Sequence, residues 1–206
     1  MRIRIGSCIL SLSLLGVLLG DAPLPAEDAE EASRLTLERI YKSEEFDGDG
    51  ISARWLDDSS GYTTLESATG PSGGRDIVRH DPGTGEREVL VPAEHLVPPG
   101  ESRPLAVDAY DWSADRSLLI VYTNSKRVWR RKTRGDYWVL DRSSRELRKL
   151  GGDAKPSTLM FAKLSPTGRQ AAYVRENDIY VEDLRGGEIT RLTTSGSGQL
   201  INGTFD

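Results

Sequence analysis

The stretch best suited to binding chemistry is a run of cations around one tryptophan. Between Tyr122 and Asp136 the chain reads TNSKRVWRRKTRG. A guanidinium offers a planar fork of N–H donors that fits carboxylates and peptide carbonyl oxygens. One interpretation is therefore an anion or carbonyl clamp. The other is a solvated basic loop, or a strand edge protected by its charges. The cations are Lys126, Arg127, Arg130, Arg131, Lys132 and Arg134, and the tryptophan is Trp129.

Strand patterns flank this stretch on both sides. A simple hairpin needs only a few connecting residues, so the thirteen residues of TNSKRVWRRKTRG predict an inserted loop between two strands. The clearest pattern comes later, in residues 159–194, which read LMFAKLSPTGRQAAYVRENDIYVEDLRGGEITRLTT. Four short apolar runs separated by turn residues predict an antiparallel four-stranded meander, the size of one propeller blade.

The pattern recurs, which favours a repeat architecture. Its third-strand segment appears as DIVRHD at 76–81, DYWVLD at 136–141 and DIYVED at 178–183. We therefore predict an all-β fold, a partial β-propeller of about three four-stranded antiparallel blades. The alternative is an ordinary β-sandwich with coincidental likeness between its strands. The predicted blades cover about 51–92, 106–151 and 158–194, with residues 195–206 starting a fourth blade.

Composition narrows the possible functions. The chain has 206 residues, 29% of them charged, and a net charge of −5, which argues against a nucleic-acid partner. Cys8 is the single cysteine and excludes an intrachain disulfide. We interpret His80 and His95 as structural or solvated. The segment Asp47–Gly50 reads DGDG but lacks the distal glutamate of a calcium loop, so it predicts a turn. We expect no metal and no cofactor.

The N-terminus has the pattern of a targeting segment. Residues 1–26 combine basic residues, an apolar run at Ile9–Leu19 and small residues at the end, as a secretory signal peptide does. The alternative is an uncleaved membrane anchor. We expect a secreted or periplasmic protein with no stable membrane span after cleavage. Residues 27–50 predict a tether or short helix before residues 51–206.

Four segments of the chain read DWSADRSLLIVY, VWRRKTRGDYWVLD, LSPTGRQAAYVRENDIYVEDL and INGTFD. Together they resemble the N-terminal part of the β-propeller domain of dipeptidyl peptidase IV, in the prolyl oligopeptidase group of serine peptidases. The resemblance covers roughly residues 35–206. It implies a peptide substrate, and it implies that Arg130, directly after Trp129, contacts a backbone carbonyl of that substrate.

The chain also departs from this family. It ends at Asp206, where the family continues into a glutamate motif that binds the substrate's amino terminus. No Gly-x-Ser-x-Gly nucleophile elbow occurs, and Ser197 has Ser195 two positions before it. We therefore assign no catalytic residue and expect no activity from this chain without the remaining blades and the hydrolase domain. The resemblance also allows a homodimer of the full-length protein.

Two functions remain open from the sequence. The first is the propeller fragment of a secreted dipeptidyl peptidase IV-like serine peptidase, which gates and binds substrate while the full-length enzyme releases N-terminal dipeptides. The alternative is an exported, non-catalytic β-propeller-like module that binds a ligand or protein.

Overall fold

The computed structural model describes residues 34–46, 50 and 52–204 of the chain. The chain divides into two units, Met1–Gly50 and Ile51–Asp206. In the first unit, helix α2 spans Leu37–Tyr41, and the Thr36 side chain caps it by accepting from the Arg39 backbone N–H. No residue of this helix is buried, so the helix depends on its cap and local contacts.

In the second unit, the described residues form three four-stranded sheets in which strand order follows the chain. The first sheet contains β1 (Ala53–Trp55), β2 (Tyr62–Ser67), β3 (Arg75–His80) and β4 (Arg87–Val91). The second contains β5 (Val107–Trp112), β6 (Leu118–Val128), β7 (Arg131–Asp141) and β8 (Leu147–Lys149). The third contains β9 (Met160–Leu164), β10 (Gln170–Arg175), β11 (Asp178–Asp183) and β12 (Ile189–Arg191). The short 3-10 helix η1 (Ala93–Leu96) follows β4. All neighbouring strands are antiparallel, which confirms the predicted fold class.

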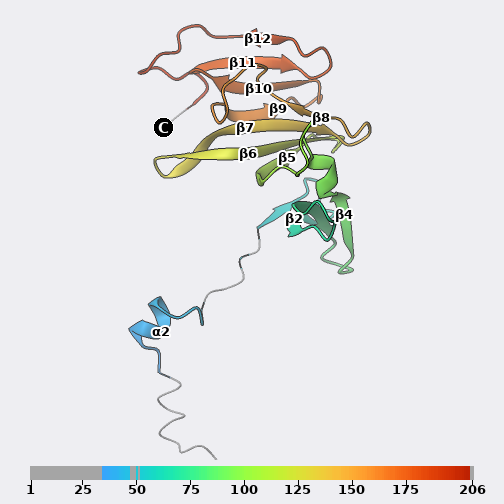
Figure 1. Ribbon diagram of the computed structural model, residues 1–206, viewed down its shortest axis with the longest axis vertical. Helices are drawn as coiled ribbons and strands as arrows, with labels where there is room; N and C mark the ends of the chain where they lie inside the picture. The colour runs from blue at the N-terminus through green and yellow to red at the C-terminus, as the bar shows by residue number, and fades with distance from the viewer. Residues whose placement is uncertain (1–33, 47–49, 51, 205–206) are drawn as a thin grey trace, which may run out of the picture. The chain divides into compact units, whose positions relative to one another are not determined.

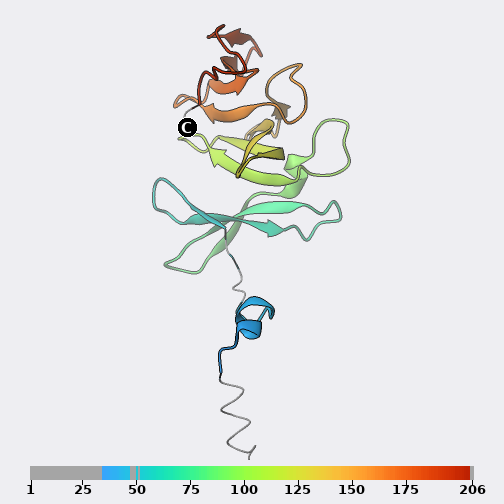
Figure 2. The same ribbon diagram turned by 90° about the vertical axis from the view of Figure 1, so that its left-hand side faces the viewer.

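The second sheet lies between the other two and is buried on both faces (Figures 1 and 2). In β6, Leu119 and Val121 pack into a core shared with the first sheet. Ile120, between them, packs into a second core shared with the third sheet. Successive side chains of a strand point to opposite faces, so a strand buried on both sides needs an unbroken apolar run. The run Leu118–Tyr122 meets this requirement.

The first aspartate of each recurring third-strand segment joins its sheet to the chain that follows. Its carboxylate accepts a hydrogen bond from a backbone N–H beyond the fourth strand. The pairs are Asp76 with Ala93 at 2.7 Å, Asp136 with Ser157 at 2.9 Å, and Asp178 with Gly196 at 3.0 Å. This shared bond explains why the aspartate recurs, because it satisfies an otherwise unpaired N–H as the chain leaves each sheet.

The last aspartate of the same segment closes the turn into the fourth strand. Its Oδ1 accepts two successive backbone N–H groups, the pattern by which aspartate stabilises turns. The donors are Gly83 and Thr84 to Asp81, Ser143 and Ser144 to Asp141, and Arg185 and Gly186 to Asp183. These bonds lower the pKa of Asp81 and Asp183. At Asp141 the Ser143 hydroxyl, followed by the backbone bonds, lowers the pKa.

Asp178 carries the largest set of contacts among the three joining aspartates. It is fully buried, and its Oδ1 accepts from the Thr193 hydroxyl at 2.7 Å and the Asn202 amide at 2.9 Å. Its Oδ2 pairs with the Arg191 guanidinium. The Thr193 hydroxyl, followed by Arg191 and the other donors, lowers the pKa of Asp178 to about 2 despite burial.

We predict that ionisation of Asp178 makes the stability of the fold depend on pH. Its pKa is about 2 in the folded protein and about 3.9 in an unfolded chain, so its ionised form stabilises the fold above pH ~4. That contribution is lost as the pH falls from about 4 to about 2. Asp178→Asn should lower Tm at neutral pH and flatten the fall of Tm in this range, as measured by circular dichroism. Glu188→Gln, at an exposed site, is the control and should leave both unchanged.

Candidate functional site

The cationic stretch of the sequence is a β-hairpin rather than the expected loop. Strands β6 and β7 run past their neighbours and pair with each other as far as Val128 and Arg131. We call residues 124–134 the hairpin arm, which projects from the second sheet in yellow in Figure 1. β5 pairs with β6 only up to Thr123, so no other described strand borders the arm.

The turn at the tip of the arm consists of Trp129 and Arg130. Trp129 has φ of +61°, and Arg130 is not among the residues with positive φ. One positive φ at the first turn position is the pattern of a type II′ turn, where glycine is usual. A bulky residue in this conformation is strained and is maintained only where its surroundings require it. The absence of glycine explains why the sequence did not predict this turn.

The two tip residues face solvent. The Trp129 side chain is 89% exposed, and the Arg130 guanidinium carbon lies 5.7 Å from its ring centroid. This distance allows a cation–π contact, which restricts the guanidinium without using its N–H donors. Arg130 makes no ion pair with a described residue. Its donors are therefore available to a ligand at the end of the arm.

Asp108 fixes the base of the arm to β5. Its Oδ1 accepts from Lys132 Nζ at 2.8 Å, and its Oδ2 accepts from the Ser125 backbone N–H at 3.2 Å. It thus binds both strands of the arm, at a register shift between Val107 and Ala109. Partial burial opposes ionisation, but the bonds from Lys132 and Ser125 outweigh it and lower the pKa of Asp108.

Tyr122, which lies in β6, also supports the base of the arm by bonding to the backbone of β7. Its hydroxyl donates to the Arg134 carbonyl at 2.8 Å, and it lies 3.2 Å from the Lys132 carbonyl. Burial raises the pKa of Tyr122 to about 12, so it remains a neutral donor at physiological pH. Its ring lies 4.8 Å from that of Tyr137.

Gly135 is required where the arm leaves the sheet. A Cβ at this position would lie 2.3 Å from Tyr122 Cε2 and 2.8 Å from the Thr123 carbonyl oxygen. Its backbone also pairs with Leu159, which links the second sheet to the third. Sequence reasoning overlooked Asp108, Tyr122 and Gly135. Only Gly135 carried a usable signal, because glycine within a strand pattern often marks a close approach.

We predict that Gly135→Ala destabilises the protein by about 1–3 kcal/mol, the usual cost of forcing an extra methyl into a packed site. Chemical denaturation measures the loss. Gly70→Ala is the matched control, since a Cβ there meets nothing within 4 Å. Equal stability of the two variants would contradict the close packing at Gly135.

A hollow of about 200 Å³ lies beside the base of the arm. The first strand of each sheet contributes to it, through residues of β1, β5 and β9. Its aromatic wall consists of Tyr110, Tyr122 and Tyr137. An aromatic surface with hydroxyl groups, close to a cationic arm, is suited to a peptide more than to a small ion.

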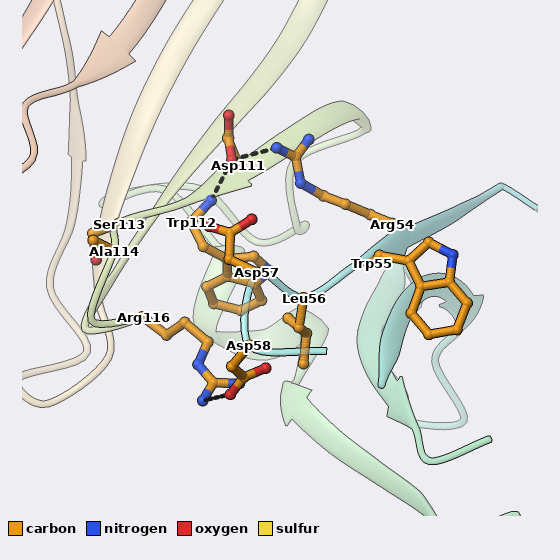
Figure 3. A pocket seen from close by; sticks show the side chains of 10 residues that line it. All are labelled: Arg54, Trp55, Leu56, Asp57, Asp58, Asp111, Trp112, Ser113, Ala114 and Arg116. Carbon is orange, nitrogen blue, oxygen red and sulfur yellow. Dashed lines mark hydrogen bonds and ion pairs between the residues drawn. The ribbon is translucent and has the colours of Figure 1, made fainter. Parts of the chain in front are cut away.

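A second cavity, between the first and second sheets, has a structural role. It measures about 70 Å³, far below the size of common ligand sites. Figure 3 shows ion pairs that cross it, Arg54 with Asp111 at 2.5 Å and Arg116 with Asp58 at 2.7 Å. These pairs connect the two sheets.

His80 lies in a polar cluster that does not form a catalytic relay. Its Nε2 lies 3.1 Å from Thr64 Oγ1 and 2.7 Å from Glu66 Oε1. A nucleophile–histidine–acid relay uses the two different ring nitrogens, whereas here both partners face the same one. Arg87, followed by His80 and Thr64, lowers the pKa of Glu66 to about 2. The cluster thus holds strands β2, β3 and β4 together.

Some sequence expectations concern residues outside the described part. The predicted signal peptide, residues 1–26, and most of the predicted turn at 47–50 lie there. Among the residues the structure describes, no helix has the length and apolar content to cross a bilayer. Within the same residues, no group of three or more His, Cys, Asp or Glu side chains is arranged to hold a metal ion.

Comparison with known proteins shows which family this chain is similar to. Residues 113–206 match the model of the dipeptidyl peptidase IV N-terminal region. The matched residues include the whole hairpin arm. The match confirms the resemblance inferred from the sequence motifs.

Individual relatives and one solved structure show the same similarity as the family model. The chain is 32% identical over 119 residues to dipeptidyl aminopeptidase B of Saccharomyces cerevisiae, covering 57% of this chain and 14% of that protein. It is 26% identical over 183 residues to an Aspergillus flavus protein named "Probable dipeptidyl peptidase 4", covering 88% and 22%. The dipeptidyl peptidase 4 crystal structure from Porphyromonas gingivalis shares the fold, with a TM-score of 0.63 and 21% identity over 79% of this chain and 22% of that one. The chain therefore spans about a fifth or less of these proteins.

We predict that Asp108→Asn loosens the arm without unfolding the sheets. The exposed pair with Lys132 contributes about 0.2–1 kcal/mol, so global stability should fall only slightly. Amide hydrogen exchange should accelerate in residues 124–134 and remain unchanged in β10 and β11. Exchange that rises equally in all three sheets would contradict a local anchoring role.

Proposed function

We propose that this chain provides the N-terminal, substrate-gating blades of a secreted or periplasmic serine peptidase that releases dipeptides from peptide N-termini. In this proposal Arg130 donates hydrogen bonds to a backbone carbonyl of the peptide substrate. The described residues bind and position substrate, and we assign bond cleavage to none of them.

The position of Arg130 carries the proposal. It lies at the exposed tip of an arm whose base is held by Asp108 and Tyr122. A guanidinium presents several donors in a fixed plane, and one charge-assisted bond to a carbonyl contributes about 1.5–3 kcal/mol. The anchored base limits how far the tip can move. A bound peptide would therefore lose little energy in ordering the arm.

Exposed apolar side chains support the presence of neighbouring parts in the working protein. Leu192, Leu200 and Ile201, which follow the last strand, are 58%, 49% and 39% exposed. A blade of a closed propeller buries such side chains against the next blade. We propose that further blades and a hydrolase domain cover this region, and that two full-length copies can associate through other surfaces.

Export is the second part of the proposal. It rests on the residue pattern of 1–26. Mass spectrometry of the protein recovered from the culture medium or periplasm tests it. An N-terminus close to residue 27 is expected, and retention of residue 1 in the cytoplasm would overturn export.

The peptidase role is tested by Arg130→Ala in the full-length gene product. We expect kcat/KM for Ala-Pro-p-nitroanilide to fall about tenfold to a hundredfold, which corresponds to loss of one charge-assisted bond. Arg130→Lys should recover only part of this loss, because lysine keeps the charge but not the planar fork.

Arg145→Ala is the matched control. Arg145 is an exposed turn residue of the same sheet, and it makes no ion pair with a described residue. Its replacement should leave kcat/KM unchanged. Full activity of Arg130→Ala would remove Arg130 from substrate binding. A wild-type protein that releases no dipeptide would overturn the peptidase function itself and favour the non-catalytic binding module.

A further inference from the structure

The hairpin arm carries more positive charge than the proposed role of Arg130 requires. Residues 126–134 contain six Lys or Arg and no Asp or Glu, in a chain of net charge −5. Besides Arg130, the cations are Lys126, Arg127, Arg131, Lys132 and Arg134. Only Lys132 forms an ion pair with a described residue, Asp108.

The pairing register sets cations directly against one another. Lys126 lies opposite Arg134, and Arg127 lies opposite Lys132. Like charges at opposed positions destabilise an antiparallel pair. The arm therefore contains two successive pairs of like charges. Asp108, which pairs with Lys132, offsets the repulsion in one of them.

Protection of an exposed strand edge accounts for only part of this pattern. Charged side chains along an open edge do prevent unwanted strand pairing. Alternating opposite charges would protect the edge equally well and would also stabilise the hairpin. The choice of one sign at both members of each pair instead favours a negatively charged ligand.

The backbone of the arm indicates what kind of ligand this is. Among the described residues, no strand outside the arm pairs with residues 124–134, so its two outer edges lack a strand partner. Side chains bind some backbone groups at the base, Asp108 the Ser125 N–H and Tyr122 the Arg134 carbonyl. An extended peptide can align with such an edge and pair with its remaining N–H and C=O groups. A free anion has no donors and so cannot pair with the C=O groups of the edge.

We propose that the hairpin arm is a binding site for peptide segments that carry acidic side chains. Lys126, Arg127, Arg131 and Arg134 bind the carboxylates, while the open strand edge binds the peptide backbone. If the proposed function holds, the arm makes the peptidase prefer substrates with Asp or Glu beyond the residues at the scissile bond.

A double variant separates binding from stability. Arg127→Glu with Arg134→Glu converts both like-charge pairs into opposite-charge pairs, with Lys132 and Lys126. The variant should be at least as stable as the wild type in thermal denaturation. It should bind acidic peptide about tenfold more weakly, since two ion pairs to the peptide are lost.

The binding measurement is fluorescence anisotropy on the 206-residue chain. The probe is a labelled, N-acetylated peptide of alternating Glu and Ala, which a dipeptidyl peptidase cannot process. The control ligand is the same peptide with Gln in place of each Glu. We expect the Glu peptide to bind more tightly at low salt and the difference to shrink at about 1 M salt, where the Debye length is about 3 Å.

Lys155→Glu with Arg169→Glu is the control for net charge. Both residues are exposed and lie in or beside the third sheet, outside the arm. This control should bind the Glu peptide as the wild type does. Equal weakening in both double variants would show a general charge effect and overturn the site. Equal affinity for the Glu and Gln peptides, or competition by heparin as strong as by the Glu peptide, would overturn it as well.

These outcomes do not depend on catalysis. If the chain binds the Glu peptide while the full-length protein releases no dipeptide, the site stands and the peptidase function fails. If dipeptides are released without any preference for acidic substrates and the Glu peptide does not bind, the site fails and the peptidase function stands.

Discussion

Burial of the second sheet on both faces is the constraint on which the described β-structure depends. Leu119 and Val121 face one core, and Ile120 faces the other. Each core is shared with a neighbouring sheet, so no sheet buries its apolar face alone. Blade architectures have this property in general, because each repeat contributes half of two interfaces. It also explains the continuous apolar run in β6, which a sheet with one solvated face would not tolerate.

Carboxylates that accept backbone hydrogen bonds supply the directional part of this packing. Asp76, Asp136 and Asp178 each bind a backbone N–H of the segment that leaves their sheet. Hydrophobic contact is not directional, whereas a hydrogen bond fixes where the next segment starts. Glu182 performs a related task between sheets, since its buried Oε2 accepts from the Gly151 N–H at 2.9 Å and the Tyr173 hydroxyl at 3.1 Å.

The hairpin arm combines a fixed base with an energetically unfavourable end. Asp108, Tyr122 and Gly135 hold the base through bonds and close packing. Beyond it stand an exposed Trp129 in a strained conformation and two like-charge pairs. Local features that cost energy persist when a rigid surrounding structure maintains them, and they are found preferentially at functional sites. The same physical reasoning supports both proposals, that Arg130 contacts substrate and that the arm binds acidic peptides.

The sequence by itself determined the all-β class and the number of four-stranded units, and it identified the cationic stretch as a candidate site. Those features depend on strand-length apolar runs and on aspartates at fixed offsets, which are local properties. Only the tertiary structure decided that the cationic stretch is a hairpin, with its turn at Trp129 and its base bound to Asp108. The turn contains no glycine, and Asp108 lies 24 residues before Lys132. Neither feature leaves a local pattern, because the turn depends on the register in which β6 and β7 pair and the ion pair joins β5 to β7.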